Sequence, residues 1–138
     1  MQVSKHKLPP RVFAYVEHEL YSYDTTGREI QQLRDDIIDA VPLMGERVQG
    51  GIGNVTQSKG IKLTSDLALL KMQRTRRAID EALKRLDEEH NQIFEYKYRQ
   101  KLDYRQVCTE IPISQSGYFY KRKELVYMVA LQMGLLNP

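Results

Sequence analysis

Apolar residues recur at helical spacing along most of the chain, and polar turns or prolines separate the segments that carry them. The first such segment, residues 11–23, places Val16 and Leu20 four residues apart on one side of a predicted helix. Pro9 and Pro10 precede it, and proline is well tolerated in the first turn of a helix. We therefore expect a helix over 11–23, followed by a polar turn that ends at Gly27.

A second helix is predicted over about 27–41, where the apolar residues run from Ile30 to Val41 at three- and four-residue steps. Thr26 and Glu29 form a capping-box pattern at its start, and Pro42 ends it. The first two helices together predict an antiparallel N-terminal hairpin. Two helices bury little apolar area, so this hairpin must pack on the rest of the chain or on a partner.

The composition changes after residue 42. Five of the eight glycines lie in residues 45–60, which predicts a flexible loop or linker over about 43–63. Thr64 or Ser65 is then expected to cap a long central helix of about 25 residues. These features divide the chain into 1–62, an N-terminal hairpin plus linker, and 63–138, a second helical domain.

The long helix is expected to end near residue 89, with a bend at His90 and a fourth helix around 93–98. Two short helices with a tight turn between them are predicted over about 104–125. Pro112 ends the first, because proline lacks an amide proton, and Ser114 is a good N-cap for the second. The apolar pattern then continues without a break to a C-terminal Gly134. This arrangement indicates a helix-turn-helix.

Two residues depart from the usual helix-turn-helix pattern. Pro112 occupies the place where the turn commonly has glycine, and Lys121 occupies a place usually filled by a second buried apolar residue. Tyr118 is at the position expected to be buried. Cys108 is expected at the close crossing of the two helices, either as a small buried thiol or as a reactive one.

Charge adds to this interpretation. The 138-residue chain has a net charge of +3, and the segment 97–123 holds seven basic and only two acidic residues. Positive charge therefore gathers where a DNA contact would need it. The alternative is a solvated basic face of no special function. The single cysteine suits a reducing cytoplasm, and no apolar run approaches the about 18 residues of a membrane span.

DNA recognition requires cations for phosphates and polar groups for base edges. Near the start of the second short helix, polar and aromatic side chains are placed to reach bases, and the basic residues after them and before the first short helix are placed to reach phosphates. The candidate DNA-binding residues are Ser114, Gln115, Ser116, Phe119, Tyr120, Lys121, Arg122, Lys123, Arg105, Lys101 and Arg99.

We expect neither an enzyme nor a cofactor. The three histidines and one cysteine lie far apart in sequence, with no spacing typical of metal ligands. The acidic pairs, such as Asp35 with Asp36, are interpreted as solvated helix faces. His90 is expected at the surface. The glycine-rich segment lacks the Lys-Ser/Thr of a phosphate-binding loop.

The chain resembles the RinA/ArpU-type phage transcriptional regulators in the order and spacing of several short motifs. These motifs are 16–23, 33–38, Ala78-Ile79 with Leu83, 96–98, Val107-Cys108, Ile113-Ser114 and the basic helix that ends in Met133-Gly134. The C-terminal part is also similar to the sigma-factor region that reads a promoter element, so the resemblance implies an all-α, sigma-region-4-like fold.

The resemblance further implies a phage or prophage transcription regulator in the bacterial host cytoplasm, an activator of late packaging and structural genes. Its partners would be double-stranded promoter DNA and host RNA polymerase. The apolar residues Leu131, Met133, Leu135 and Leu136 are expected either in the core or at a homodimer contact. Two alternatives stay open. One is a DNA-recognition subunit of a packaging machine of the small-terminase kind, and the other is a protein-interaction module.

Overall fold

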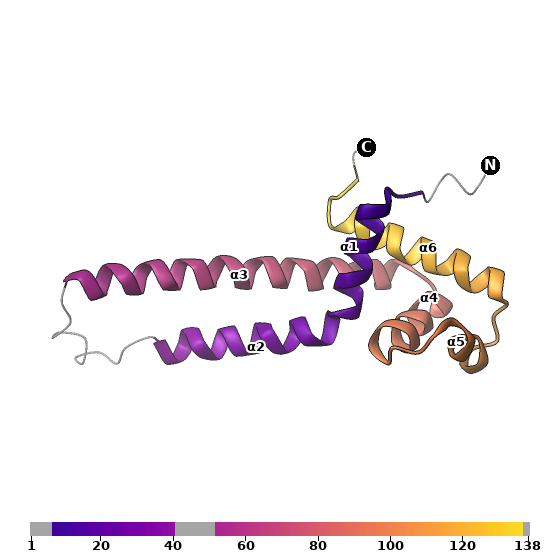
Figure 1. Ribbon diagram of the computed structural model, residues 1–138, viewed down its shortest axis with the longest axis horizontal. Helices are drawn as coiled ribbons and strands as arrows, with labels where there is room; N and C mark the ends of the chain where they lie inside the picture. The colour runs from indigo at the N-terminus through magenta and orange to yellow at the C-terminus, as the bar shows by residue number, and fades with distance from the viewer. Residues whose placement is uncertain (1–6, 41–51, 137–138) are drawn as a thin grey trace. The chain divides into compact units, whose positions relative to one another are not determined.

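The computed structural model describes residues 7–40 and 52–136, with side chains for 7–39 and 66–136. The described residues are helical and contain no strand, which confirms the predicted all-α class. The elements in chain order (Figure 1) are α1 Pro10–Tyr21, α2 Tyr23–Ala40, α3 Ile52–Arg85, α4 Glu88–Ile93, the π-helix η3 Phe94–Arg99, α5 Tyr104–Glu110 and α6 Gln115–Gln132. None of the described helices is long and apolar enough to span a membrane.

The chain forms two compact units. One, the core unit, comprises Met1–Asp24 and Thr75–Pro138; the other, the hairpin unit, is Thr25–Arg74. The units interleave along the sequence, because the hairpin unit is inserted between the two segments of the core unit. The expected division at residue 62 lies inside α3 and does not coincide with either boundary.

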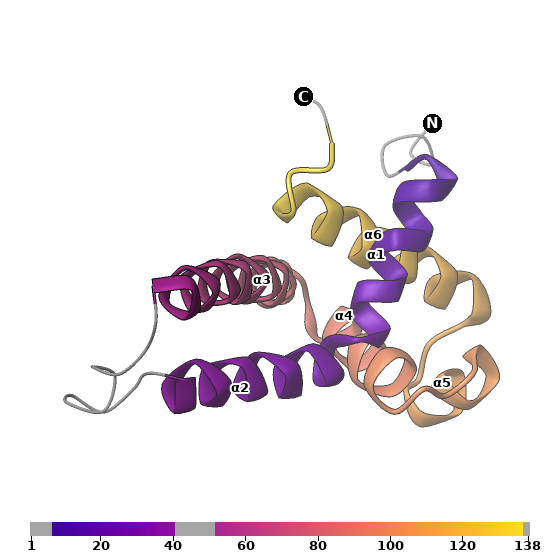
Figure 2. The same cartoon turned by 60° about the vertical axis from the view of Figure 1, so that its left-hand side comes forward.

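In the core unit, α1 packs across α6 in both views (Figures 1 and 2) and also contacts η3, while α4 and α5 both contact α6 and η3. Every helix of this unit contributes to one apolar core. Its buried side chains are Val16, Leu20, Ile79, Ala82, Ile93, Phe94, Tyr98, Val107, Ile111, Tyr118, Leu125, Val126, Val129 and Ala130.

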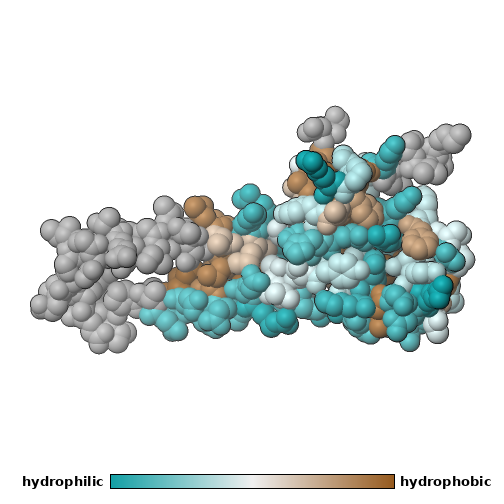
Figure 3. Space-filling model, viewed as in Figure 1, coloured by the Kyte–Doolittle hydropathy of each residue, from teal (hydrophilic) through white to brown (hydrophobic). Residues whose placement is uncertain are grey.

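In the hairpin unit, α2 and α3 run in opposite directions. Among its described side chains only Ile30 is a buried hydrophobic residue. Ile38, Leu67 and Leu70 are 67%, 60% and 54% exposed, and hydrophobic side chains of this unit are visible at the surface in Figure 3. The described side chains of the hairpin unit therefore leave much of its apolar stripe exposed.

The predicted pairing of the first two helices in an N-terminal hairpin is wrong, because α1 packs elsewhere. The helix belongs to the core unit and lies against α6 and η3, because Val16 and Leu20 are fully buried there. The expected polar turn before Gly27 is also wrong. Only Ser22 interrupts the helices, and Thr26 lies inside α2 and so is no cap.

The loop predicted over about 43–63 is wrong from Ile52 onward, where α3 begins; residues 41–51 lie outside the described part of the chain. Thr64 and Ser65 are consequently inside α3 rather than at its start. Isolated glycines cost a helix about 1 kcal/mol each. Because helix growth is cooperative, such a cost does not end a helix that continues from a well-packed segment.

The end of α3 also differs from the prediction, since the helix stops at Arg85 rather than near residue 89. Asp87 begins α4 with a capping box, in which its carboxylate accepts from the backbone N–H of His90 and its own N–H donates to the His90 ring. The fourth predicted helix corresponds to the π-helix η3, in which the backbone hydrogen bonds join residues five apart instead of four.

Three predicted helix ends are confirmed. Pro10 opens α1, and the Ser114 hydroxyl accepts a hydrogen bond from the backbone N–H of Gly117. Gly134, with φ +76°, follows α6, and its N–H donates to the carbonyl of Leu131 while that of Leu135 donates to Ala130. This is the Schellman arrangement, which satisfies carbonyls at the helix end.

Candidate functional site

The candidate site is the pair of helices α5 and α6 with the short turn between them. Asp103 caps α5 by accepting from the N–H of Gln106, and the Gln106 side chain accepts from the N–H of Asp103 in return. Ile111 ends α5 in an extended conformation and is buried. The capped start of α6 follows after Ile113. Local side-chain hydrogen bonds thus cap the N-terminal ends of both helices.

One side of α6 is buried and the opposite side is exposed. Tyr118 is 1% exposed, which confirms its predicted core position, and Leu125 below it is fully buried. Burial raises the pKa of Tyr118 to about 12, so its hydroxyl keeps its proton at neutral pH. The helix is therefore held by a broad apolar face, and its other face is left for contacts outside the core.

The exposed side of α6 carries polar residues along its first three turns. Gln115, Ser116 and Lys123 are exposed, and Tyr120 is 44% exposed. Ser116, Tyr120 and Lys123 follow one another at four- and three-residue steps, so they lie along one helix face. Lys123 has no carboxylate partner among the residues that the structure describes.

Arg122 does not share that face. Its guanidinium donates through Nε and Nη2 to the Glu17 carboxylate of α1, at 2.8 and 2.9 Å, and lies over the Phe13 ring. The buried Tyr98 donates its hydroxyl to the same carboxylate at 2.6 Å. Burial alone raises the pKa of Glu17, but the hydrogen bonds from Arg122 and Tyr98 outweigh it, and the net shift is downward. Arg122 therefore joins α6 to α1.

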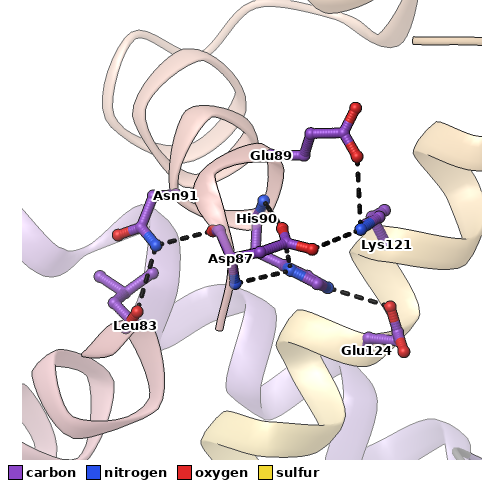
Figure 4. A network of polar contacts seen from close by, with 7 residues as sticks. All are labelled: Leu83, Asp87, Glu89, His90, Asn91, Lys121 and Glu124. Carbon is purple, nitrogen blue, oxygen red and sulfur yellow. Dashed lines mark hydrogen bonds and ion pairs between the residues drawn. The ribbon is translucent and has the colours of Figure 1, made fainter. Parts of the chain in front are cut away.

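Lys121 is also turned toward carboxylates of its own chain. Its ammonium lies 2.6 Å from Asp87 Oδ2 and 3.3 Å from Glu89 Oε1. Figure 4 shows Asp87 and Glu89, at the start of α4, directed toward Lys121 of α6, and the His90 ring directed toward Glu124. The lysine that breaks the usual helix-turn-helix pattern thus links α6 to α4.

The expectation that His90 lies at the surface is wrong, because this histidine is only 4% exposed. Its Nδ1 lies 2.7 Å from Asp87 Oδ1, and its Nε2 lies 3.0 Å from Glu124 Oε1. A polar ring is stable in the core only when its nitrogens are hydrogen-bonded, and both nitrogens have partners here. The histidine is a bridge between α4 and α6.

The remaining candidates lie on the supporting elements. Arg99 is paired with Asp24 and Glu95, and Lys101 donates to the carbonyl of Tyr21. Arg105 is exposed beside Tyr104, whose ring contacts those of Tyr118 and Phe119. Phe119 is therefore partly committed to an aromatic cluster, while Arg105 projects into solvent.

Cys108 is half-buried and packs against the core. Burial raises the pKa of its thiol, which disfavours the reactive thiolate. No group of three or more histidine, cysteine or acidic side chains that could hold a metal ion occurs in the described part of the chain.

Two residues that position α6 were missed by the sequence interpretation. Glu17 gives no local signal, since its partner lies 105 residues away along the chain. Asp87 does have one, because an aspartate followed three residues later by a side chain able to accept from its own backbone N–H is typical of a helix start. The same pattern recurs at Asp103 and Gln106.

Replacement of Asp87 by asparagine should make stability less dependent on acid pH. The hydrogen bond from Lys121 is the main cause that lowers the pKa of Asp87, so its carboxylate stabilises the folded state above the unfolded pKa of about 3.9. Asparagine keeps the cap but not the charge. We expect the stability advantage of the wild type to be full at pH 6–7 and to shrink as pH falls below about 4.

Urea unfolding at several pH values measures this difference. Glu88→Gln is the matched control, because Glu88 is exposed in the same helix turn. A gap between wild type and Asp87→Asn that stays constant from pH 7 to pH 3 would contradict the assignment.

Comparison with known proteins places these helices in a family. The model of the family described as "Protein of unknown function (DUF722)" matches residues 16–130, which include the second half of α1, all of the elements from α2 to α5 and most of α6. Neither the curated proteins nor the solved structures contain a significant match. Since the matched region spans well over half of the chain, the protein belongs to the DUF722 family.

Proposed function

We propose that the protein binds double-stranded DNA through a helix-turn-helix formed by α5 and α6, with α6 as the recognition helix. One observation carries the proposal. The N-terminal half of α6 presents Gln115, Ser116, Tyr120 and Lys123 to solvent, while its opposite face is anchored in the core through Tyr118. A rigid helix with a polar exposed face is what insertion into a major groove requires.

The chemistry of that face suits DNA. Glutamine can donate to and accept from an adenine edge, serine pairs with several bases, and lysine reaches guanine or phosphate. Arg105 on α5 adds an exposed cation next to the helix pair. The described structure thus supports Gln115, Ser116, Tyr120 and Lys123 as the contacts, with Arg105 for the backbone.

Lys121 and Arg122 have a different role in this proposal. Both are engaged by carboxylates of α4 and α1, so they orient α6 rather than contact phosphates. Removing all three basic residues at 121–123 together would weaken the fold as well as binding. Lys123 alone is the informative position.

The resemblance to phage late regulators supplies the biological part of the proposal. We propose an activator of phage packaging and structural genes that acts on a promoter in the bacterial cytoplasm, in contact with RNA polymerase. Transcription from the phage late promoter in vitro tests it. Stimulation of a terminase without any increase in RNA would instead favour a packaging subunit.

A homodimer is the further partner proposed. Leu131 and Leu135 are 45% and 40% exposed near the end of the chain, while Met133 and Leu136 pack against the core. A dimer would require DNA half-sites spaced by about one helical turn or a multiple of it. Sedimentation of wild type and Leu131→Glu tests this, and a footprint on the phage genome gives the symmetry of the site.

Lys123→Ala should weaken DNA binding without loss of stability. Duplexes enriched by the protein from a random pool provide the ligand. We expect about 3- to 10-fold weaker binding and a salt dependence, log Kd against log[salt], that falls by roughly one unit. Lys84→Ala, at an exposed lysine of α3 in the same unit, should leave both unchanged.

Failure of the wild type to enrich any duplex would overturn the DNA-binding proposal and leave the protein-interaction module. Equal binding by wild type and Lys123→Ala, with DNA bound, would show that the exposed face of α6 is not the contact surface.

A further inference from the structure

A second cationic site lies on Tyr21, at the end of α1. The Lys97 ammonium donates to the Tyr21 hydroxyl at 2.8 Å, and the Lys101 ammonium donates to the Tyr21 carbonyl at 3.2 Å. The two nitrogens lie 5.2 and 5.9 Å from the centroid of the same Tyr21 ring. Two positive charges are thus gathered around one residue, Tyr21.

Neither lysine is neutralised by an ion pair. No carboxylate among the described residues lies within salt-bridge distance of Lys97 or Lys101, whereas Arg99 between them is paired with both Asp24 and Glu95. The positive charge of Lys97 contributes to the lowered pKa of Glu17, but the Glu17 carboxylate already accepts hydrogen bonds from Arg122. Each ammonium has three N–H donors and uses one of them on Tyr21, so donors remain for an anion.

The backbone around the two lysines is unusual. Lys101 has φ +62°, and it is the only non-glycine residue with positive φ in the described chain. Lys97 belongs to the π-helix η3, a rare form that is frequently found at functional sites. Strained conformations persist where the surrounding structure imposes them, and they cluster at binding sites. Here both irregularities place a lysine on Tyr21.

The ring of Tyr21 is itself held firmly. It stands edge-on to the buried Tyr98 at a centroid distance of 4.9 Å, and Lys97 lies 5.1 Å from the centroid of Tyr98 as well. The Tyr21 ring that contacts the two ammonium groups is therefore part of the core unit. Preorganised cations lose less conformational freedom on binding than free surface lysines do.

We propose that Lys97 and Lys101 bind a phosphate of the DNA backbone, separately from the exposed face of α6. The proposal rests on the proposed DNA-binding function and names a second contact for it. Such a contact carries no sequence information and fixes the position of the protein on the duplex.

Lys97→Gln and Lys101→Asn test the site, because both remove a charge and asparagine tolerates the left-handed backbone of residue 101. With an enriched duplex, each variant should lower the salt slope by about one unit and weaken binding about 3- to 10-fold, with the preferred sequence unchanged. Lys84→Gln is the matched control. Unchanged slopes in both variants, with wild type bound, would overturn the site and leave the α6 proposal standing.

Amide NMR with a short duplex of arbitrary sequence separates the two proposals further, since phosphates are contacted in non-specific binding too. We expect shifts at Tyr21, Lys101 and Leu102 that disappear in Lys97→Gln with Lys101→Asn. Shifts there without shifts at Ser116 and Lys123, with the enriched duplex as well, would keep this site and overturn the role of α6. No shift at Tyr21 and Lys101 would overturn this site.

Discussion

The Glu17→Ala variant is expected to unfold with a free energy about 2–3 kcal/mol lower than that of the wild type. Removing one partner of a buried ion pair costs about 3–5 kcal/mol, and the loss is smaller here because the pair is not completely buried. The side chains of Arg122 and Glu17 are 26% and 16% exposed. The change would also leave the hydroxyl of Tyr98 without its acceptor in the core. Denaturant unfolding at neutral pH measures the difference.

Glu19→Ala is the matched control for this prediction. Glu19 lies two residues further along α1, is half-buried, and makes no ion pair within the described residues. Its loss should change stability by less than about 0.5 kcal/mol. If the two variants were equally stable, the carboxylate of Glu17 would not hold α6 to α1. A Glu17→Leu, Arg122→Met double variant should recover much of the loss, because it leaves no unpaired charge.

Leu125→Ala should cost about 3 kcal/mol, since deletion of a buried leucine side chain typically costs 2–5 kcal/mol. Leu125 is fully buried on the core side of α6 and belongs to the same cluster as Tyr118 and Val129. The cavity left behind would lie in the core that supports the exposed face of α6. Urea unfolding gives the free energy, and DNA binding should persist at low temperature because no proposed contact is removed.

Leu131→Ala tests whether burial is the cause. This leucine lies on the same helix but is 45% exposed, so the same substitution should change stability by less than about 0.5 kcal/mol. A loss at Leu131 as large as that at Leu125 would contradict the assignment of the two faces of α6.

Much of the helical pattern could be predicted from local sequence. The helix starts at Pro10 and Ser114 and the helix end at Gly134 agree with the structure, because each depends on a residue's own backbone or side-chain preference. The predictions failed at residues 24–27, where α2 starts early, and at residues 52–65, where α3 extends into the glycine-rich segment. There, propensity was a weak guide because neighbouring helical turns extend a helix at little cost.

The position of the candidate site in the sequence was predicted, but the directions in which its basic side chains point were not. Lys121, Arg122 and Lys123 all carry a positive charge. Only Lys123 is exposed without a carboxylate partner in the described structure. The difference arises from Asp87 and Glu17, which come from α4 and α1. No local pattern links either residue to α6.

The sequence by itself determined the all-α class, the N-cap and the terminal glycine of the last helix, and the basic segment around its start, since periodicity, capping and charge are properties of neighbouring residues. Only the tertiary structure decided that α1 packs on α6, that His90 is buried, and that Lys97 and Lys101 meet on Tyr21. These features depend on contacts between residues up to 105 positions apart. Such contacts are selected by the shape and polarity of whole packed surfaces, which no single segment of the chain contains.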